Sequence, residues 1–210
     1  MIEILIVDDH AMVREGLRLI IERESDIRIV GETGCGAETI EFLRRRTVGI
    51  VVLDIVLPDR NGIEVLKEIR RDFKDISVLM LSMHAEDRFG VRSIQAGASG
   101  YISKGSAAED LVKAVRMIYK GAKYIPQGLA EALAAEVHYE RGLEEHERLS
   151  DREFEIMLLM GSGKTRAEIA KRLNLSPATV STYRRRVLSK MNLMTNAELM
   201  RYVMENHLLE

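Results

Sequence analysis

The sequence of 210 residues contains a single cysteine, Cys35. One cysteine excludes a disulfide framework within the chain, and no Cys/His spacing resembles a zinc site. We interpret Cys35 as a small buried thiol. No apolar run reaches the roughly 18 residues needed to span a bilayer, and the first residues lack the charged and apolar regions of a secretory signal. These absences predict a cytoplasmic protein without a membrane partner.

The net charge of −2 hides a difference between the two parts of the chain. From Ser150 onward there are ten Lys and Arg against seven Asp and Glu, which gives +3. Subtracting these from the totals of 31 and 33 leaves 21 against 26, or −5, for the preceding residues. With 46% apolar residues, the chain can bury one large core and one smaller core. We therefore predict an acidic domain followed by a basic one.

Residues 1–122 alternate short apolar runs with segments of helical spacing. The runs are uninterrupted, as in parallel strands that are covered on both faces. They are Ile4–Val7, Ile27–Val30, Ile50–Leu53, Val78–Leu81 and Tyr101–Ile102. This pattern predicts an α/β domain with a doubly wound, five-stranded parallel sheet. In such a sheet, ligands bind at the carboxyl ends of the strands.

Polar residues follow four of these runs. Three are the carboxylates Asp8, Asp9 and Asp54, and the others are Ser82 and Lys104. Three negative charges placed together are costly unless a hard cation lies among them, so the cluster predicts Mg²⁺. With the cation and Lys104 neutralising phosphoryl oxygens, Asp54 would become an aspartyl phosphate, to which Ser82 donates its hydroxyl. The alternative is that the Asp8-Asp9 pair caps the next helix and Lys104 pairs with it.

The segment 123–148 is predicted to be a linker that begins as a helix and ends in a charged run. The alternative is that it forms the last helix of the first domain. From 149 to 210 the spacing is helical, and each of four helices begins at a capping residue. The caps are Ser150, Thr165, Ser176 and Thr195. The tight turn between the second and third helices predicts a small all-α helix-turn-helix domain.

Three consecutive arginines, Arg184–Arg186, lie on the third of these helices. Arginines and a helix N-terminus suit phosphate contacts, while residues on an exposed face can reach base edges. The alternative is an ordinary solvated face. In the last helix, Leu199 and Val203 are either a dimer contact or part of their own domain's core. The basic third helix favours DNA as a partner.

These segments resemble a known family. Over residues 1–122 the chain is similar to the receiver domain of two-component response regulators. The motifs that carry this resemblance are Val7-Asp8-Asp9-His10, Leu53-Asp54 with Pro58 and Gly62, Leu81-Ser82, and Gly100-Tyr101-Ile102-Ser103-Lys104. Residues 149–193 resemble the LuxR-type helix-turn-helix of the NarL/FixJ subfamily, and within it the GacA/UvrY-like branch.

The resemblance implies a flavodoxin-like receiver in which Asp54 is the phosphoacceptor. It also implies three groups of site residues. The metal ligands are Asp8, Asp9, Asp54 and the Val56 backbone carbonyl, and the switch residues are Ser82, Tyr101 and Lys104. The DNA-binding residues are Thr179, Ser181, Thr182, Arg184, Arg185 and Lys190, while Val180, Val187 and Met191 face the core. Mg²⁺ is the cofactor that this family uses.

The function predicted by these features is a transcription factor regulated by phosphorylation, and not an enzyme. A partner histidine kinase would phosphorylate Asp54, which promotes homodimerisation and sequence-specific binding to double-stranded DNA. Two alternatives stay open. One is a metal-dependent phosphohydrolase that acts through an aspartyl phosphate, and the other is an interaction module that signals without DNA.

Overall fold

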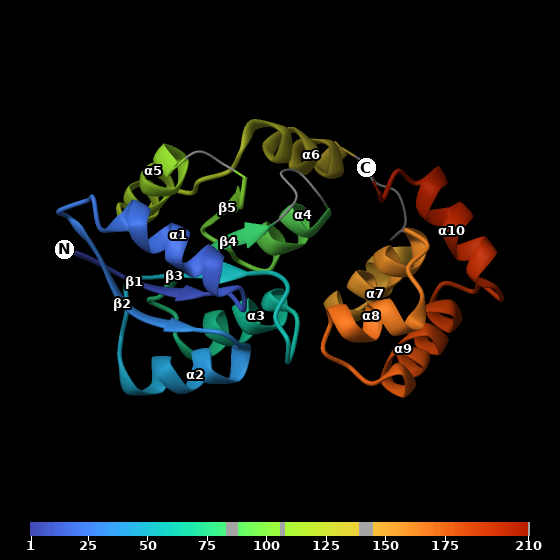
Figure 1. The fold of residues 1–210 in the computed structure, drawn as a ribbon. Helices are drawn as coiled ribbons and strands as arrows, with labels where there is room; N and C mark the ends of the chain where they lie inside the picture. The colour runs from blue at the N-terminus through green and yellow to red at the C-terminus, as the bar shows by residue number, and fades with distance from the viewer. Residues whose placement is uncertain (83–87, 106–107, 139–144, 210) are drawn as a thin grey trace. The chain divides into compact units, whose positions relative to one another are not determined.

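The computed structural model of the chain describes residues 1–82, 88–105, 108–138 and 145–209 (Figure 1). The chain divides after His138 into two compact units, which are described separately. In the part of the chain that the structure describes, no helix is both long enough and apolar enough to cross a membrane. Cys35 is only half-buried, because it lies at the start of a helix and not in the core. The interpretation of a buried thiol is therefore wrong.

The first unit is built around a parallel sheet with the strand order β2-β1-β3-β4-β5. The strands are β1 (Ile2–Val7), β2 (Ile27–Thr33), β3 (Ile50–Asp54), β4 (Ser77–Ser82) and β5 (Gly100–Ser103). Each strand contains the apolar run from which it was predicted. The chain winds in opposite directions from β1 and β3, so the carboxyl ends of these two neighbours form the switch point of a doubly wound sheet. The predicted fold class is confirmed.

Helices cover both faces of this sheet, with α1 and α5 on one face and α2 and α3 on the other (Figure 1). The helices are α1 (Ala11–Ile21), α2 (Gly36–Arg45), α3 (Gly62–Asp72), α4 (Arg88–Gln95) and α5 (Ala108–Tyr119). Consecutive residues of the inner strands, such as Leu5 and Ile6 or Val51 and Val52, are buried. Burial on both faces explains why the strand sequences are uninterrupted apolar runs.

One more helix, α6 (Gln127–His138), belongs to the first unit. It packs on α4, where Leu129 is fully buried and lies so near Gly90 that a Cβ there would be 2.9 Å from the leucine Cδ1. The predicted linker of 123–148 therefore begins with a helix, and the structure places that helix with the first unit. Residues 139–144 of this segment lie outside the described residues.

The second unit is helical. Its elements are η1 (Glu145–Arg148), α7 (Asp151–Gly161), α8 (Arg166–Arg172), α9 (Pro177–Lys190) and α10 (Asn196–Glu205). All four predicted caps are present, because the side chains of Ser150, Thr165, Ser176 and Thr195 each accept a hydrogen bond from the backbone N–H three residues later. The predicted helix-turn-helix of α8 and α9 is confirmed.

Leu199 and Val203, the candidate dimer contact, are fully buried inside the second unit. Helix α10 packs on α7, and a Cβ on Gly161 of α7 would lie 2.8 Å from a Val203 methyl group. Of the two alternatives for these side chains, a dimer contact or the core of their own domain, the structure shows the second.

Candidate functional site

An acidic cluster lies at the switch point of the sheet. Asp8 follows β1, and Asp54 ends the neighbouring β3, so parallel pairing brings their carboxylates to the same edge. Asp8, Asp9, His10 and Asp54 each offer one ligand atom, and these atoms all lie within 4.8 Å of one another. Asp8 is fully buried and Asp54 is 2% exposed. Two carboxylates are thus held together where water cannot readily solvate them.

Lys104 lies between the two buried carboxylates. Its Nζ is 2.7 Å from Asp54 Oδ2, to which it donates a hydrogen bond, and 2.7 Å from Asp8 Oδ2. Strand pairing positions it, because the Lys104 backbone N–H donates to the Ser82 carbonyl at 2.6 Å. The ion pair between Lys104 and Asp8, which we considered as an alternative to a phosphoryl site, is therefore present. The same Lys104 ammonium also contacts Asp54, the proposed phosphoacceptor.

Burial dominates the electrostatics of this cluster. It raises the pKa of Asp54 to about 6, because desolvation disfavours the carboxylate more than the Lys104 ammonium favours it, and Asp8 adds repulsion. Desolvation also opposes the charge of Lys104, but the two neighbouring carboxylates outweigh it and raise the lysine pKa. Above this pKa of about 6 the Asp54 carboxylate is therefore ionised at an energetic cost, which a divalent cation would relieve.

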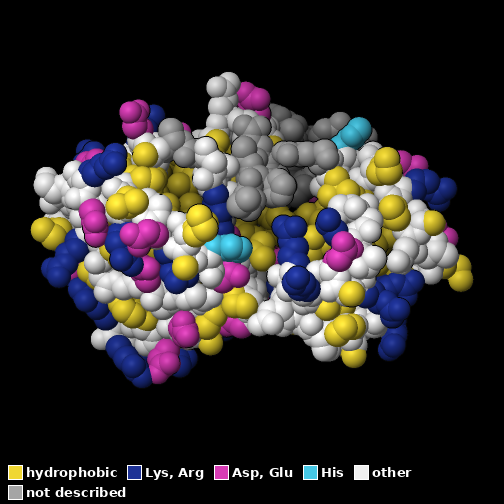
Figure 2. Space-filling view, in the orientation of Figure 1, with side chains coloured by type: hydrophobic (Ala, Val, Ile, Leu, Met, Phe, Trp, Pro, Cys, Tyr) yellow, Lys and Arg dark blue, Asp and Glu magenta, His cyan; other side chains and the backbone are white. Residues whose placement is uncertain are grey.

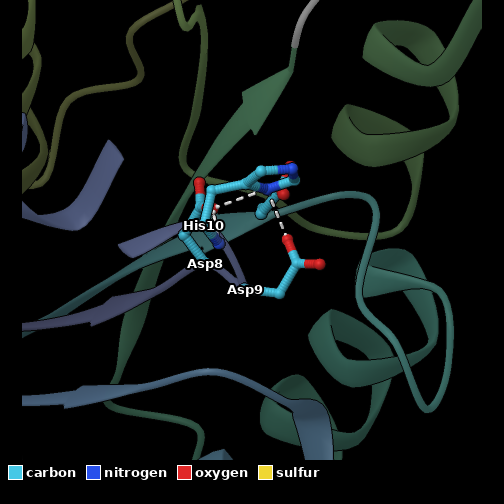
Figure 3. Close-up of side chains that lie close together, drawn as sticks. Asp8, Asp9 and His10 are labelled. Carbon is cyan, nitrogen blue, oxygen red and sulfur yellow. Dashed lines mark hydrogen bonds and ion pairs between the residues drawn. The ribbon is translucent and has the colours of Figure 1, made fainter. Parts of the chain in front are cut away.

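His10 is a member of the cluster that the sequence analysis did not assign. Figure 3 shows its ring directed at the Asp9 carboxylate, with Nδ1 2.6 Å from Asp9 Oδ1 and 3.3 Å from Asp8 Oδ1. Its backbone N–H also donates to Asp8 Oδ1 at 2.8 Å. Its position directly after the acidic pair was the available signal. The ring is 65% exposed, so it lies at the solvent side of the site.

The remaining predicted receiver residues, Ser82, Tyr101 and Val56, lie on β4, on β5 and in the loop after Asp54. Ser82 ends β4 with its side chain buried, and Tyr101 of β5 is fully buried. Val56, predicted to offer its carbonyl, pairs with Asn61 in an isolated antiparallel bridge within the loop after Asp54. The structure therefore brings Asp8, Asp9, Asp54 and Lys104 together, places Ser82 at the adjacent strand end, and leaves Tyr101 in the core.

We expect Asp54→Asn to stabilise the cation-free protein at pH 8 by about 1 to 3 kcal/mol. The folded pKa of about 6 exceeds the unfolded value of about 3.9, so between these values the native state binds more protons and stability falls as pH rises. The free-energy cost of ionising the buried Asp54 reaches its full value above the folded pKa. Urea unfolding in EDTA should show a large increase in the unfolding free energy of Asp54→Asn over the wild type at pH 8 and a small increase at pH 4.5. An equal increase at both pH values would contradict the raised pKa of Asp54.

Helix α9 presents a basic surface. Figure 2 shows Lys and Arg side chains gathered over this helix. Val180, Val187 and Met191 are fully buried, as the resemblance implied. Of the predicted DNA contacts, one group is exposed and the other half-buried. The exposed group is Thr182, Arg185 and Lys190, and the half-buried group is Thr179, Ser181 and Arg184.

The three consecutive arginines differ in their contacts. Arg184 Nε donates to Asn196 Oδ1 at 2.7 Å, which joins α9 to the start of α10. The Arg186 guanidinium lies 5.8 Å from the Tyr183 ring centroid, within cation–π range. Arg185 makes no hydrogen bond, ion pair or ring contact with any described residue. Of the three, Arg185 is thus the most available for a ligand.

Two other predicted contacts already have partners within the unit. Lys190 Nζ lies 2.6 Å from Glu153 Oε2, a carboxylate that also accepts from the cap residue's N–H. Ser181 Oγ accepts from Arg166 Nη1 at 3.2 Å, which links the N-termini of α8 and α9. The Lys190 contact therefore joins α9 to α7, and the Ser181 contact joins the two helices of the helix-turn-helix.

Comparisons with known proteins divide the chain in the same way. Residues 4–116 match the family of the response regulator receiver domain, and residues 147–203 match the LuxR family of bacterial regulatory proteins. The chain is 39% identical over 200 residues to the response regulator UvrY of Escherichia coli K12, covering 95% of this chain and 92% of that one. It is 33% identical over 200 residues to the response regulator GacA of Pseudomonas aeruginosa, covering 95% and 94%.

Solved structures give the same likeness. RcsB from Salmonella enterica serovar Typhimurium, bound to a promoter in the presence of the phosphomimetic BeF₃⁻, is 26% identical with a TM-score of 0.65, covering 96% of this chain and 98% of that one. An RcsB–DNA complex is 27% identical with a TM-score of 0.60, covering 96% and 97%.

Proposed function

Since the chain belongs to the response regulators with a LuxR-type DNA-binding domain, we propose that phosphorylation of Asp54 controls its binding to DNA. The observation that carries this proposal is the contact of Lys104 Nζ with both Asp54 and Asp8, each at 2.7 Å, in a buried site. This contact supports Asp54 as the nucleophile, because the Lys104 ammonium lies beside its carboxylate. The phosphodonor is a partner histidine kinase.

The acidic cluster fits Mg²⁺. Carboxylate oxygens are the hard ligands that this ion prefers, and Asp8, Asp9 and Asp54 each offer a ligand atom within 4.8 Å of the others. We propose Asp8, Asp9, Asp54 and the Val56 carbonyl as the residues that would hold it. When bound, the ion would supply positive charge to the phosphoryl oxygens.

Transfer to Asp54 forms one bond and breaks one. A carboxylate oxygen of Asp54 attacks the phosphorus, and the bond from phosphorus to the histidine nitrogen of the kinase breaks, with its electron pair leaving on the nitrogen. The Lys104 ammonium already contacts the Asp54 carboxylate, so it would lie within reach of a phosphoryl oxygen on that side chain. Ser82 donates its hydroxyl to the modified group, and Tyr101 takes part in the switch.

The DNA contacts follow from the exposed face of α9. We propose that Ser181, Thr182 and Arg185 face the major groove, while Thr179 and Lys190 face the DNA backbone and Arg184 supports the helix. A single helix-turn-helix makes few contacts, so tight binding uses two copies on half-sites about one DNA turn apart. Phosphorylation favours this homodimer by a population shift.

Two consequences complete the proposal. The protein acts in the cytoplasm, where bacterial DNA and the catalytic part of a sensor kinase are found together, and it turns over no substrate. Measuring the hydrolysis of a generic phosphomonoester tests whether the protein turns over a substrate. Multiple turnover that Asp54→Asn abolishes would favour the phosphohydrolase instead. Absence of a salt-dependent DNA complex would favour the interaction module.

Lys104→Ala should keep phosphoryl uptake but lose most of the rise in DNA affinity that phosphorylation causes. The variant leaves Asp54 as nucleophile and removes the group that senses the phosphoryl oxygens. In coupled systems of this kind a modification changes affinity about 5- to 150-fold. In Lys104→Ala we expect the ratio of DNA affinities with and without phosphorylation to approach one. Gel-shift titrations with and without acetyl phosphate measure it. Lys120→Ala, an exposed lysine after α5, is the matched control. Full coupling in Lys104→Ala would contradict this role.

A further inference from the structure

The loop that follows Asp54, residues 55–61, is closed at its base. Val56 and Asn61 pair across it in an antiparallel bridge. At its end, a Cβ on Gly62 would lie 2.0 Å from the Asp54 carbonyl oxygen, so only glycine allows the chain to return this closely. The shape of the loop is therefore set from within, and its position relative to Asp8 depends on what holds its tip.

The tip of the same loop caps a different helix. Asp59 accepts hydrogen bonds from the backbone N–H groups of Gly36 and Ala37, at 2.9 Å to Oδ1 and 2.9 Å to Oδ2. These are the first two residues of α2, whose own N-cap, Cys35, offers no side-chain hydrogen bond. A carboxylate at a helix N-terminus is favoured by both the free N–H groups and the helix dipole. Asp59 thus joins the loop to α2.

A neighbouring side chain tightens this contact. Arg60 lies over Gly36 so closely that a Cβ there would be 2.5 Å from the arginine Nε. Its Nη1 donates to Glu68 Oε2 of α3 at 2.6 Å. The loop tip is therefore packed against the start of α2 and anchored to α3.

The start of α2 is also connected to the other side of the acidic cluster. The hydroxyls of Thr39 in α2 and Thr33 at the end of β2 are hydrogen-bonded at 2.7 Å. The Thr33 carbonyl in turn accepts from the Asp8 backbone N–H at 3.2 Å. Helix α2 thereby lies in a chain of contacts that runs from Asp8 to the loop after Asp54.

We propose that Asp59 is a positioning residue for the cation site. By holding the tip of loop 55–61 on α2, it fixes the distance between the Val56 carbonyl and the Asp8 carboxylate, and so tunes affinity for a divalent cation. This inference rests on the proposed function, because it assumes that the acidic cluster binds Mg²⁺. Asp59 itself touches neither the cation nor the phosphoryl group.

The test separates positioning from helix capping. In Asp59→Ala both the tether and the cap of α2 are lost. In the double variant Cys35→Ser/Asp59→Ala, the serine hydroxyl can cap α2 locally without contacting the loop. Glu38→Ala is the control, because Glu38 accepts from the Gly34 N–H at 3.3 Å at the same helix end and does not touch the loop. The measurements are the Mg²⁺ dissociation constant by calorimetry and the melting temperature in EDTA.

Asp59→Ala should raise the Mg²⁺ dissociation constant about tenfold or more and lower the melting temperature. The double variant should recover the melting temperature but keep the weak Mg²⁺ binding, and Glu38→Ala should bind Mg²⁺ like the wild type. Recovery of both properties in the double variant, or unchanged affinity in Asp59→Ala, would overturn the positioning role alone. A wild-type chain that binds no Mg²⁺ would overturn the proposed function and this inference together.

Discussion

Acetyl phosphate and Mg²⁺ will add one phosphoryl group to the wild-type chain and none to Asp54→Asn. The neutral amide oxygen of asparagine is a poor nucleophile toward phosphorus, whereas the Asp54 carboxylate is buried and held at 2.7 Å from the Lys104 ammonium. Chelating the Mg²⁺ with EDTA should also prevent labelling, because the three carboxylates would then repel the donor. Intact-mass spectrometry reads out both results.

The control for this experiment is Asp72→Asn, which removes one negative charge from the end of α3, where the Asp72 carboxylate pairs with Arg71. It should be labelled like the wild type. Equal labelling of Asp54→Asn would mean that another residue accepts the phosphoryl group. Labelling that is insensitive to EDTA would remove the acidic cluster from the reaction.

The sequence was sufficient to predict the sheet and most of the acidic site. Parallel strands buried on both faces need uninterrupted apolar runs, and their carboxyl ends meet at one edge, so Asp8 and Asp54 could be placed together from their positions alone. The helix caps were predictable for a similar reason, because Ser150 and Thr165 satisfy the N–H groups of their own helices and act over three residues.

Features that depend on contacts distant in sequence were missed. Asp59 caps α2 from 22 and 23 residues away, and neither helical spacing nor a capping motif near Cys35 indicates it. Helix α6 was expected in a linker because its place on α4 depends on the fit of Leu129 against Gly90. Leu199 was ambiguous, since an apolar stripe looks alike whether its own domain or a second copy covers it.

Arg185→Ala should weaken binding to a cognate DNA fragment about 5- to 150-fold, which corresponds to about 1 to 3 kcal/mol. Arg184 is held by Asn196 and Arg186 lies over Tyr183, so Arg185 is the arginine of the three that is free to form a bidentate contact with a base or to reach a phosphate. Fragments selected from genomic DNA by the phosphorylated protein supply the cognate sequence. The affinity is measured at several salt concentrations.

The salt dependence distinguishes the two roles of Arg185. A base-reading arginine loses affinity for the cognate fragment and little for unrelated DNA, with an unchanged salt slope, whereas a phosphate-binding one weakens both and lowers the slope by about 1. Arg148→Ala in η1 removes the same charge from an exposed position outside α9 and should leave cognate binding close to the wild type. Since net charge alone would make the two variants equal, equal losses would sink the assignment of α9 as the reading helix. A loss confined to Arg185→Ala, and larger for the phosphorylated protein, would connect the acidic site to the DNA through this helix.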